Sequence, residues 1–79
     1  MARLPSLSSS QIIRALKRAG FDDAPTRGKG SHRALYRTGE DGRVRLVIVP
    51  KGKDVPRGTV QSILNQAGLS RDEFLRLLG

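Results

Sequence analysis

The chain has no cysteine and a single histidine among its 79 residues. Without cysteine it has neither a disulfide framework nor a thiolate zinc site to brace the fold. We expect no metal and no cofactor, because the chemistry considered below takes its nucleophile from the substrate. No apolar run approaches the roughly 18 residues that a membrane span requires. The first residues, "MARLPSLSSSQ", also lack the apolar core of a signal peptide. Together these absences favour a cytoplasmic protein that makes no contact with a membrane.

Acidic residues are scarce as well, because seven Asp and Glu stand against fifteen Lys and Arg and leave a net charge of +8. The excess is concentrated between residues 27 and 57, where nine basic and three acidic residues leave +6. Such a field attracts a polyanion, since each phosphate that is neutralised releases counterions. A domain this basic indicates a nucleic-acid partner. The alternative is a solvated basic face that confers only solubility.

Three segments with apolar residues at helical spacing predict helices. The first two end at a glycine, and the first and third begin with a capping box, a serine followed three residues later by Gln or Glu. For the second helix we expect Thr59 as the N-cap. The other predicted boundary residues are Ser8, Gln11, Gly20, Gly68, Ser70 and Glu73. The residues expected to face the core are Ile12, Leu16, Val60, Ile63, Leu64, Phe74 and Leu78.

The stretch between the first two predicted helices indicates strands. "SHRALYRTG" and "RVRLVIVP" have strand composition, and Asp41-Gly42 between them is a hairpin signal. "FDDAPTRGKG" is at best a short edge strand, since it contains Pro25. Alternation along the last strand leads us to expect Arg43 and Arg45 on the face that is open to solvent.

The order of helix, three strands, helix and short final helix predicts one α+β domain, residues 1–79. So few helices cannot cover both faces of a three-stranded sheet. We therefore expect all the helices on one face of an antiparallel meander, with the other face open. A chain of this length buries only roughly 60–65% of its unfolded surface, so the core will be small.

The single histidine, His32, lies in "GKGSHRALYR" at the start of a predicted strand. Gly28 and Gly30 permit backbone conformations and a close approach that side chains would block. Lys29 and Arg33 flank the imidazole with positive charge, which should disfavour its protonation. In the alternative interpretation, His32 is a strand-end residue that hydrogen-bonds a backbone carbonyl and has no other role.

A neutral imidazole near pH 7 can act as a general base. Beside a bound ribose it would take the proton of the 2′-hydroxyl as that oxygen attacks the adjacent phosphorus, while nearby cations stabilise the charge that builds on the phosphoryl oxygens. The chain has no second histidine to protonate the leaving 5′-oxygen, so Tyr36, a lysine or water would have to do so. From the residues alone, slow RNA hydrolysis and RNA binding without catalysis both remain open.

The chain also resembles a known family, the HicA toxins, small ribosome-independent mRNA interferases of bacterial toxin–antitoxin pairs. The resemblance rests on the order and spacing of "IIRALKRAGF", "GKGSH", "VIVP" and "GTVQSILNQAGLSRDEF". It implies a double-stranded-RNA-binding-domain fold and a HicB-type antitoxin as the protein partner. It also implies that His32 of the Gly-Ser-His motif is the catalytic residue, with Gly30 and Ser31 beside it.

We therefore predict a metal-independent endoribonuclease that cleaves mRNA with His32 as the general base. The predicted RNA-binding residues are Lys29, Gly30, Ser31, Arg33 and Lys51. Many relatives carry a second histidine shortly after the strand-ending proline, whereas here Pro50 is followed by Lys51-Gly52-Lys53. If that histidine assists catalysis, either a lysine replaces it in this chain or the activity is lower. Arg14 and Lys17 fit a solvated face or an antitoxin contact equally well. Two alternatives remain: a non-catalytic RNA-binding module on the same basic surface, and a protein whose charge serves to dock an acidic antitoxin.

Overall fold

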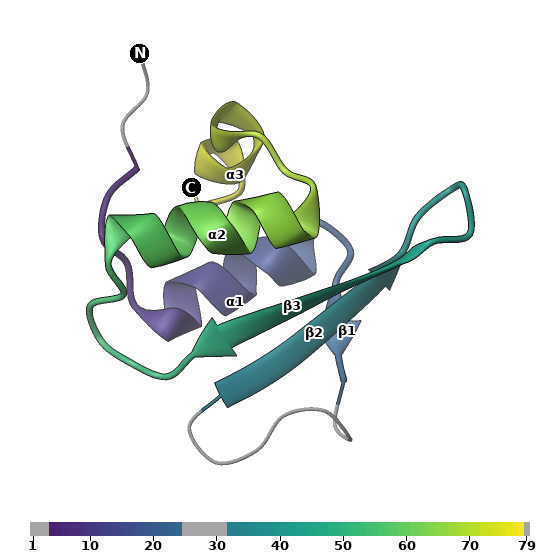
Figure 1. Cartoon of the computed structure of the whole chain (residues 1–79). Coiled ribbons are helices and arrows are strands. Elements are labelled where there is room, and N and C mark those ends of the chain that lie inside the picture. The colour runs from purple at the N-terminus through teal and green to yellow at the C-terminus, as the bar shows by residue number, and fades with distance from the viewer. Residues whose placement is uncertain (1–3, 25–31, 79) are drawn as a thin grey trace.

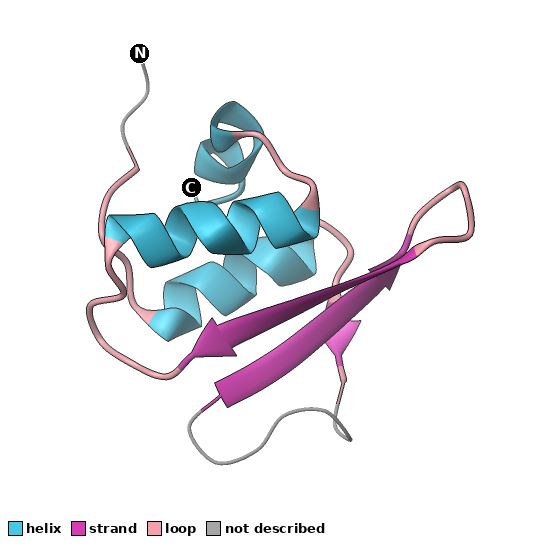
Figure 2. Ribbon diagram, in the orientation of Figure 1, coloured by secondary structure: helices cyan, strands magenta, loops and turns pink. Residues whose placement is uncertain are grey.

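The computed structural model describes residues 4–24 and 32–78. In this part of the chain, three helices lie on one face of a three-stranded antiparallel sheet, and no helix lies on the opposite face (Figures 1 and 2). This confirms the α+β layout expected from the sequence. The elements are α1 (Ser9–Arg18), β1 (Asp22–Asp23), β2 (His32–Thr38), β3 (Val44–Pro50), α2 (Arg57–Ala67) and α3 (Arg71–Leu78).

Helix α1 begins where the capping box predicts. The Ser8 hydroxyl accepts a hydrogen bond from the Gln11 backbone N–H at 3.2 Å, and the Ser8 N–H donates to the Gln11 side chain at 2.9 Å. These bonds satisfy donors that the first turn would otherwise leave without partners. The chain leaves the helix through Gly20, whose φ of 96° is a conformation that favours glycine.

The start of α2 differs from the prediction. We expected Thr59 as the N-cap, and this expectation is wrong, because the helix begins at Arg57 with Pro56 as its cap. Proline fixes φ near the helical value and needs no N–H partner at a helix start, so it can begin the helix without a capping side chain. The end agrees with the sequence, since Gly68 is left-handed with φ 71°. Ser70 then opens α3 through a second capping box.

The sheet has the order β1-β2-β3 with antiparallel neighbours. Strands β2 and β3 form a hairpin whose ladder runs from His32 opposite Pro50 to Thr38 opposite Val44. The turn closes through a bond from the Gly39 N–H to the Arg43 carbonyl at 2.8 Å. Gly42 takes a positive φ of 80°, as the Asp-Gly signal predicts.

The two faces of β3 have opposite surroundings. Val47 and Val49 are almost fully buried under the helices, whereas Val44 is 63% exposed and Leu46 and Ile48 are also exposed on the open face. Facing pairs in a ladder share a face, so Leu35 of β2, opposite Val47, is buried as well. The open face is therefore largely apolar.

Our expectation for the arginines is wrong for Arg45. It lies two residues before Val47 and so shares the helix-covered face, where a Cβ added to Gly68 would stand only 2.7 Å from its Cζ. Arg43 precedes β3 and belongs to the turn, where its Nε lies 3.8 Å from the Asp41 carboxylate. The error came from assigning the face by charge, although burial of the two valines against the helices decides it.

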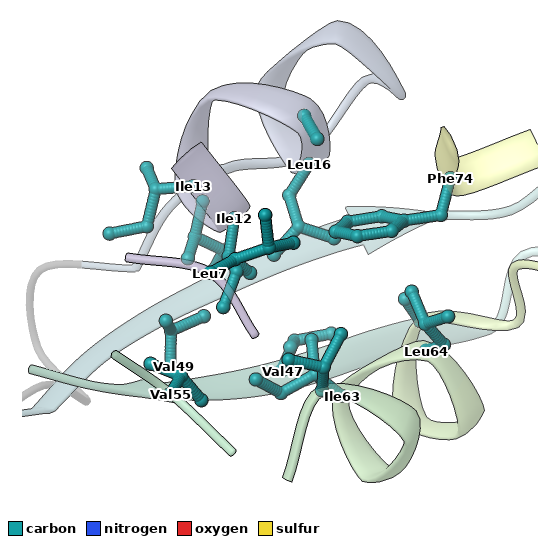
Figure 3. Close-up of a cluster of buried hydrophobic side chains, with 14 of the residues drawn as sticks. Leu7, Ile12, Ile13, Leu16, Val47, Val49, Val55, Ile63, Leu64 and Phe74 are labelled. Carbon is teal, nitrogen blue, oxygen red and sulfur yellow. The ribbon is translucent and has the colours of Figure 1, made fainter. Parts of the chain in front are cut away.

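The core forms where the inner stripes of the helices meet the covered face of the sheet (Figure 3). Ile12 and Leu16 come from α1, and Phe74 from α3 closes one end of the cluster. All three are fully buried. Leu78, expected in the core, packs against this cluster while only partly buried.

Two valines of β3 test the assignment of its faces. Val47→Ala should lower the free energy of unfolding by about 2–3 kcal/mol, because it removes buried methyl groups and leaves a cavity. The matched control Val44→Ala should change it by less than about 0.5 kcal/mol. Urea denaturation measures both, and equal losses for the two variants would contradict the assignment.

Candidate functional site

His32 is the first residue of β2, and its side chain is exposed. Successive side chains alternate across a strand, so His32 shares the open face with Ala34 and Tyr36. In the ladder His32 stands opposite Pro50, the last residue of β3. The next residue, the exposed Lys51, therefore lies at the same end of the sheet as His32. The register thus places two of the predicted site residues at the same end of the sheet.

The backbone beyond Lys51 is held by the start of α1. The Ser9 N–H donates to the Gly52 carbonyl at 2.9 Å, and the Ser9 hydroxyl donates to the same oxygen at 3.1 Å. The segment is tied again by an antiparallel bridge between Leu7 and Val55. These bonds fix the chain after Lys51, and the ladder fixes Pro50 before it, so the backbone at Lys51 is held on both sides. Nothing in the sequence pattern singled out Ser9, which is 43 positions from its partner.

Arg33 does not join His32. As the next residue along β2 it points to the opposite, helix-covered face, where its guanidinium forms an ion pair with Asp23 of β1. The same carboxylate accepts a hydrogen bond from the Lys17 ammonium of α1 at 2.9 Å. One acidic side chain thus connects α1, β1 and β2. The remaining predicted RNA-binding residues, Lys29, Gly30 and Ser31, lie outside the described residues.

The two cations stabilise the charged form of Asp23. Its pKa lies below the ordinary value of 3.8, chiefly because of the hydrogen bond from Lys17 and then because of that from Arg33. The two contacts use both carboxylate oxygens, so the carboxylate holds the cations close to each other. Sequence reasoning passed over Asp23, although an acidic residue next to a basic segment was a usable signal.

Within residues 4–24 and 32–78, no group of three or more His, Cys, Asp or Glu side chains is placed to hold a metal ion. In the same part of the chain, no helix combines the length and the apolar character needed to cross a bilayer.

By fold and site, the molecule is a small basic α+β domain with an exposed histidine at the end of a half-covered sheet. The sequence model of the family described as HicA toxin of bacterial toxin–antitoxin matches residues 9–69, more than half of the chain. The chain therefore belongs to the HicA toxin family and is a toxin whose system includes an antitoxin. A search among curated proteins finds no match.

Replacing Asp23 with Asn should make the acid dependence of stability less steep. A carboxyl group whose pKa is lowered by folding stabilises the folded state above its unfolded pKa, and this contribution disappears as the pH falls through the folded pKa. Asp23→Asn should therefore be less stable than the wild type near neutral pH, and the difference should close as the pH falls below 3.8 and through the lowered pKa of Asp23. Urea denaturation over this pH range measures the effect.

The control is Asp22→Asn, on the neighbouring residue, because Asp22 has no ion-pair partner among the described residues. A constant stability difference between Asp23→Asn and the wild type at all pH values would contradict the role given to the ion pairs.

Proposed function

We propose that this toxin is an endoribonuclease that cleaves mRNA in the cytoplasm without a metal ion, with His32 as the general base. The observation that carries the proposal is the exposure of His32 at the end of the sheet where the exposed Lys51 also lies. A buried ring would be inaccessible to a transcript. Membership in the HicA family supports the same activity.

The chemistry uses the substrate's own nucleophile. His32 takes the proton of a ribose 2′-hydroxyl, and the 2′-oxygen forms a bond to the adjacent phosphorus. The bond from phosphorus to the 5′-oxygen breaks, and that oxygen leaves with a proton. The products are a 2′,3′-cyclic phosphate and a 5′-hydroxyl end. DNA has no 2′-hydroxyl and is not cleaved.

Geometry favours Lys51 over Tyr36 as the group that assists the leaving oxygen. Tyr36 is on the same face as His32 but four residues away, which is about 13 Å along the strand. Two side chains this far apart are poorly placed to act on opposite sides of one phosphorus. Lys51 follows the residue that pairs with His32, and its flexible stem carries a cation that can stabilise the phosphoryl charge or donate the proton.

We further propose a HicB-type antitoxin as the partner that restrains this activity. An acidic protein would be attracted by the net charge of +8.

His32→Ala tests the catalytic assignment. Loss of a general base should slow RNA cleavage by about 10²–10⁴-fold, and it should relieve growth arrest when the toxin is produced without antitoxin. The thermal midpoint should stay within a few degrees of the wild type, since substitutions at exposed positions rarely change stability by more than about 0.5 kcal/mol. The measurement is cleavage of a single-stranded RNA, with mass analysis of the fragment ends.

The control is Thr38→Ala at the far end of β2, on the same face as His32, which should cleave at the wild-type rate. An RNA with a 2′-O-methyl group at the cleaved position should resist. If the wild type and His32→Ala retain RNA equally and neither cleaves it, the protein is a binding module and the enzyme proposal is wrong. A large loss of stability in His32→Ala would instead show a structural role.

Lys51→Gln tests the second group. It should reduce kcat by about 10²-fold or more, whereas Lys53→Gln, an equal loss of charge two residues further along, should have a much smaller effect. Tyr36→Phe should leave the rate within a few-fold of the wild type because of its distance from His32. Single-turnover cleavage rates distinguish these cases. If Tyr36→Phe cleaves slowly while Lys51→Gln cleaves at the wild-type rate, Tyr36 and not Lys51 is the second group.

A further inference from the structure

A basic cleft lies between α1 and the start of β2, on the face of the sheet opposite the His32 side chain. It has a volume of about 490 Å³, and the described residues that line it supply four cations, one hydroxyl and one apolar side chain. The lining residues are Ser10, Ile13, Arg14, Lys17, Arg18 and Arg33. We call this the α1 cleft. It contains Arg33 but not Lys51 or His32, so it is separate from the proposed catalytic end of the sheet.

The cations of the α1 cleft are only partly neutralised. Asp23 pairs with Lys17 and Arg33, which leaves a net charge of +3 among the five groups. Arg18 donates to the Leu77 carbonyl at 2.7 Å, a neutral acceptor that leaves its charge uncompensated. Arg14 has no hydrogen-bond or ion-pair partner among the described residues. Helix α1 itself contains no acidic residue.

The charged and hydroxyl groups of the lining fit a phosphate backbone. Protein interfaces bury a central apolar patch from which charged residues are depleted. Among the described residues of the α1 cleft, Ile13 is the one apolar residue, and the side-chain stems of the cations add further apolar surface. Arginine, lysine and serine are the side chains that contact phosphate oxygens, and the planar guanidinium can bind two of them at once.

The positions of the cations also suit a chain of phosphates. Arg14, Lys17 and Arg18 are spaced i, i+3 and i+4, so they lie on one side of α1 over about 6 Å of its axis. This length corresponds to one or two successive phosphates of a nucleic-acid strand. Arg33 of β2 lines the same cleft as these α1 cations, and it directly follows His32 in the sequence.

We propose that the α1 cleft is a subsite for single-stranded RNA that binds one or two backbone phosphates flanking the one at His32. The identity of the ligand rests on the proposed function, since RNA is taken to be the substrate. The subsite contributes affinity and positions the strand without touching the reacting atoms. Asp23 is a positioning residue that fixes Lys17 and Arg33 beside each other.

The test measures binding apart from cleavage. In a His32→Ala background, a labelled single-stranded RNA of about 12 nucleotides stays intact, and its Kd is measured between about 50 and 200 mM salt. Each lost phosphate contact should reduce the slope of log K against log salt by about 0.7, which is about fivefold in affinity at 0.1 M salt. We expect this loss for Arg14→Gln and about twice this loss for Arg14→Gln/Arg18→Gln.

The matched control is Arg43→Gln/Arg76→Gln, which removes two exposed cations that do not line the α1 cleft. If the control changes the slope of log K against log salt as much as the cleft variant does, RNA is attracted by the overall positive charge and the proposal is wrong. Unchanged RNA affinity with weakened antitoxin binding would overturn it in favour of a protein contact. Arg14→Gln by itself keeps the test decisive if losing the bond from Arg18 to Leu77 unfolds the double variant.

Cleavage by the wild type separates the two proposals. If it cleaves RNA no faster than His32→Ala, the proposed function fails while the salt slopes still decide the subsite. If cleavage occurs, Arg14→Gln should raise KM for the 12-nucleotide RNA and leave kcat within a few-fold, as expected of a group that only positions the strand. A fall in kcat with unchanged KM would overturn this role.

Discussion

The pairing of β2 with β3 is the constraint on which the rest of this structure depends. The register that puts Leu35 opposite Val47 also puts His32 opposite Pro50. A slip of one residue would turn the buried valines of β3 towards solvent and change the partner of His32. Burial of the core and placement of the candidate site are thus consequences of one alignment, and the hydrophobic effect fixes both.

Charge is organised by a second constraint. A small protein with a net charge of +8 repels itself, and its cations would separate without local compensation. Asp23 limits this repulsion where α1, β1 and β2 meet, by pairing with Lys17 and Arg33. Strand β1 is only two residues long, yet it carries this carboxylate to the helix-covered side of the sheet. The basic groups therefore lie in two places. His32 and Lys51 are at one end of the sheet, and the α1 cleft is on the helix-covered side.

Helix caps and helix ends that depend on neighbouring residues could be predicted from the sequence. The choice between two possible caps, or between two faces of a strand, could not. The capping boxes at Ser8 and Ser70 and the helix stop at Gly68 involve residues a few positions apart, and all were predicted. The predicted cap at Thr59 failed because Pro56 could start the helix earlier. The predicted face of Arg45 failed because alternation shows which residues share a face, but not which face the helices cover.

The sequence by itself determined the class of fold, the positions of most helix and strand ends, and His32 and Lys51 as candidate site residues. Only the tertiary structure decided that Arg33 points away from His32, that Ser9 holds the segment after Lys51, and that α1 contributes its cations to a cleft. The physical reason is distance along the chain. Periodicity and capping act over a few residues, whereas these contacts join groups up to 43 positions apart that meet only once the core has packed.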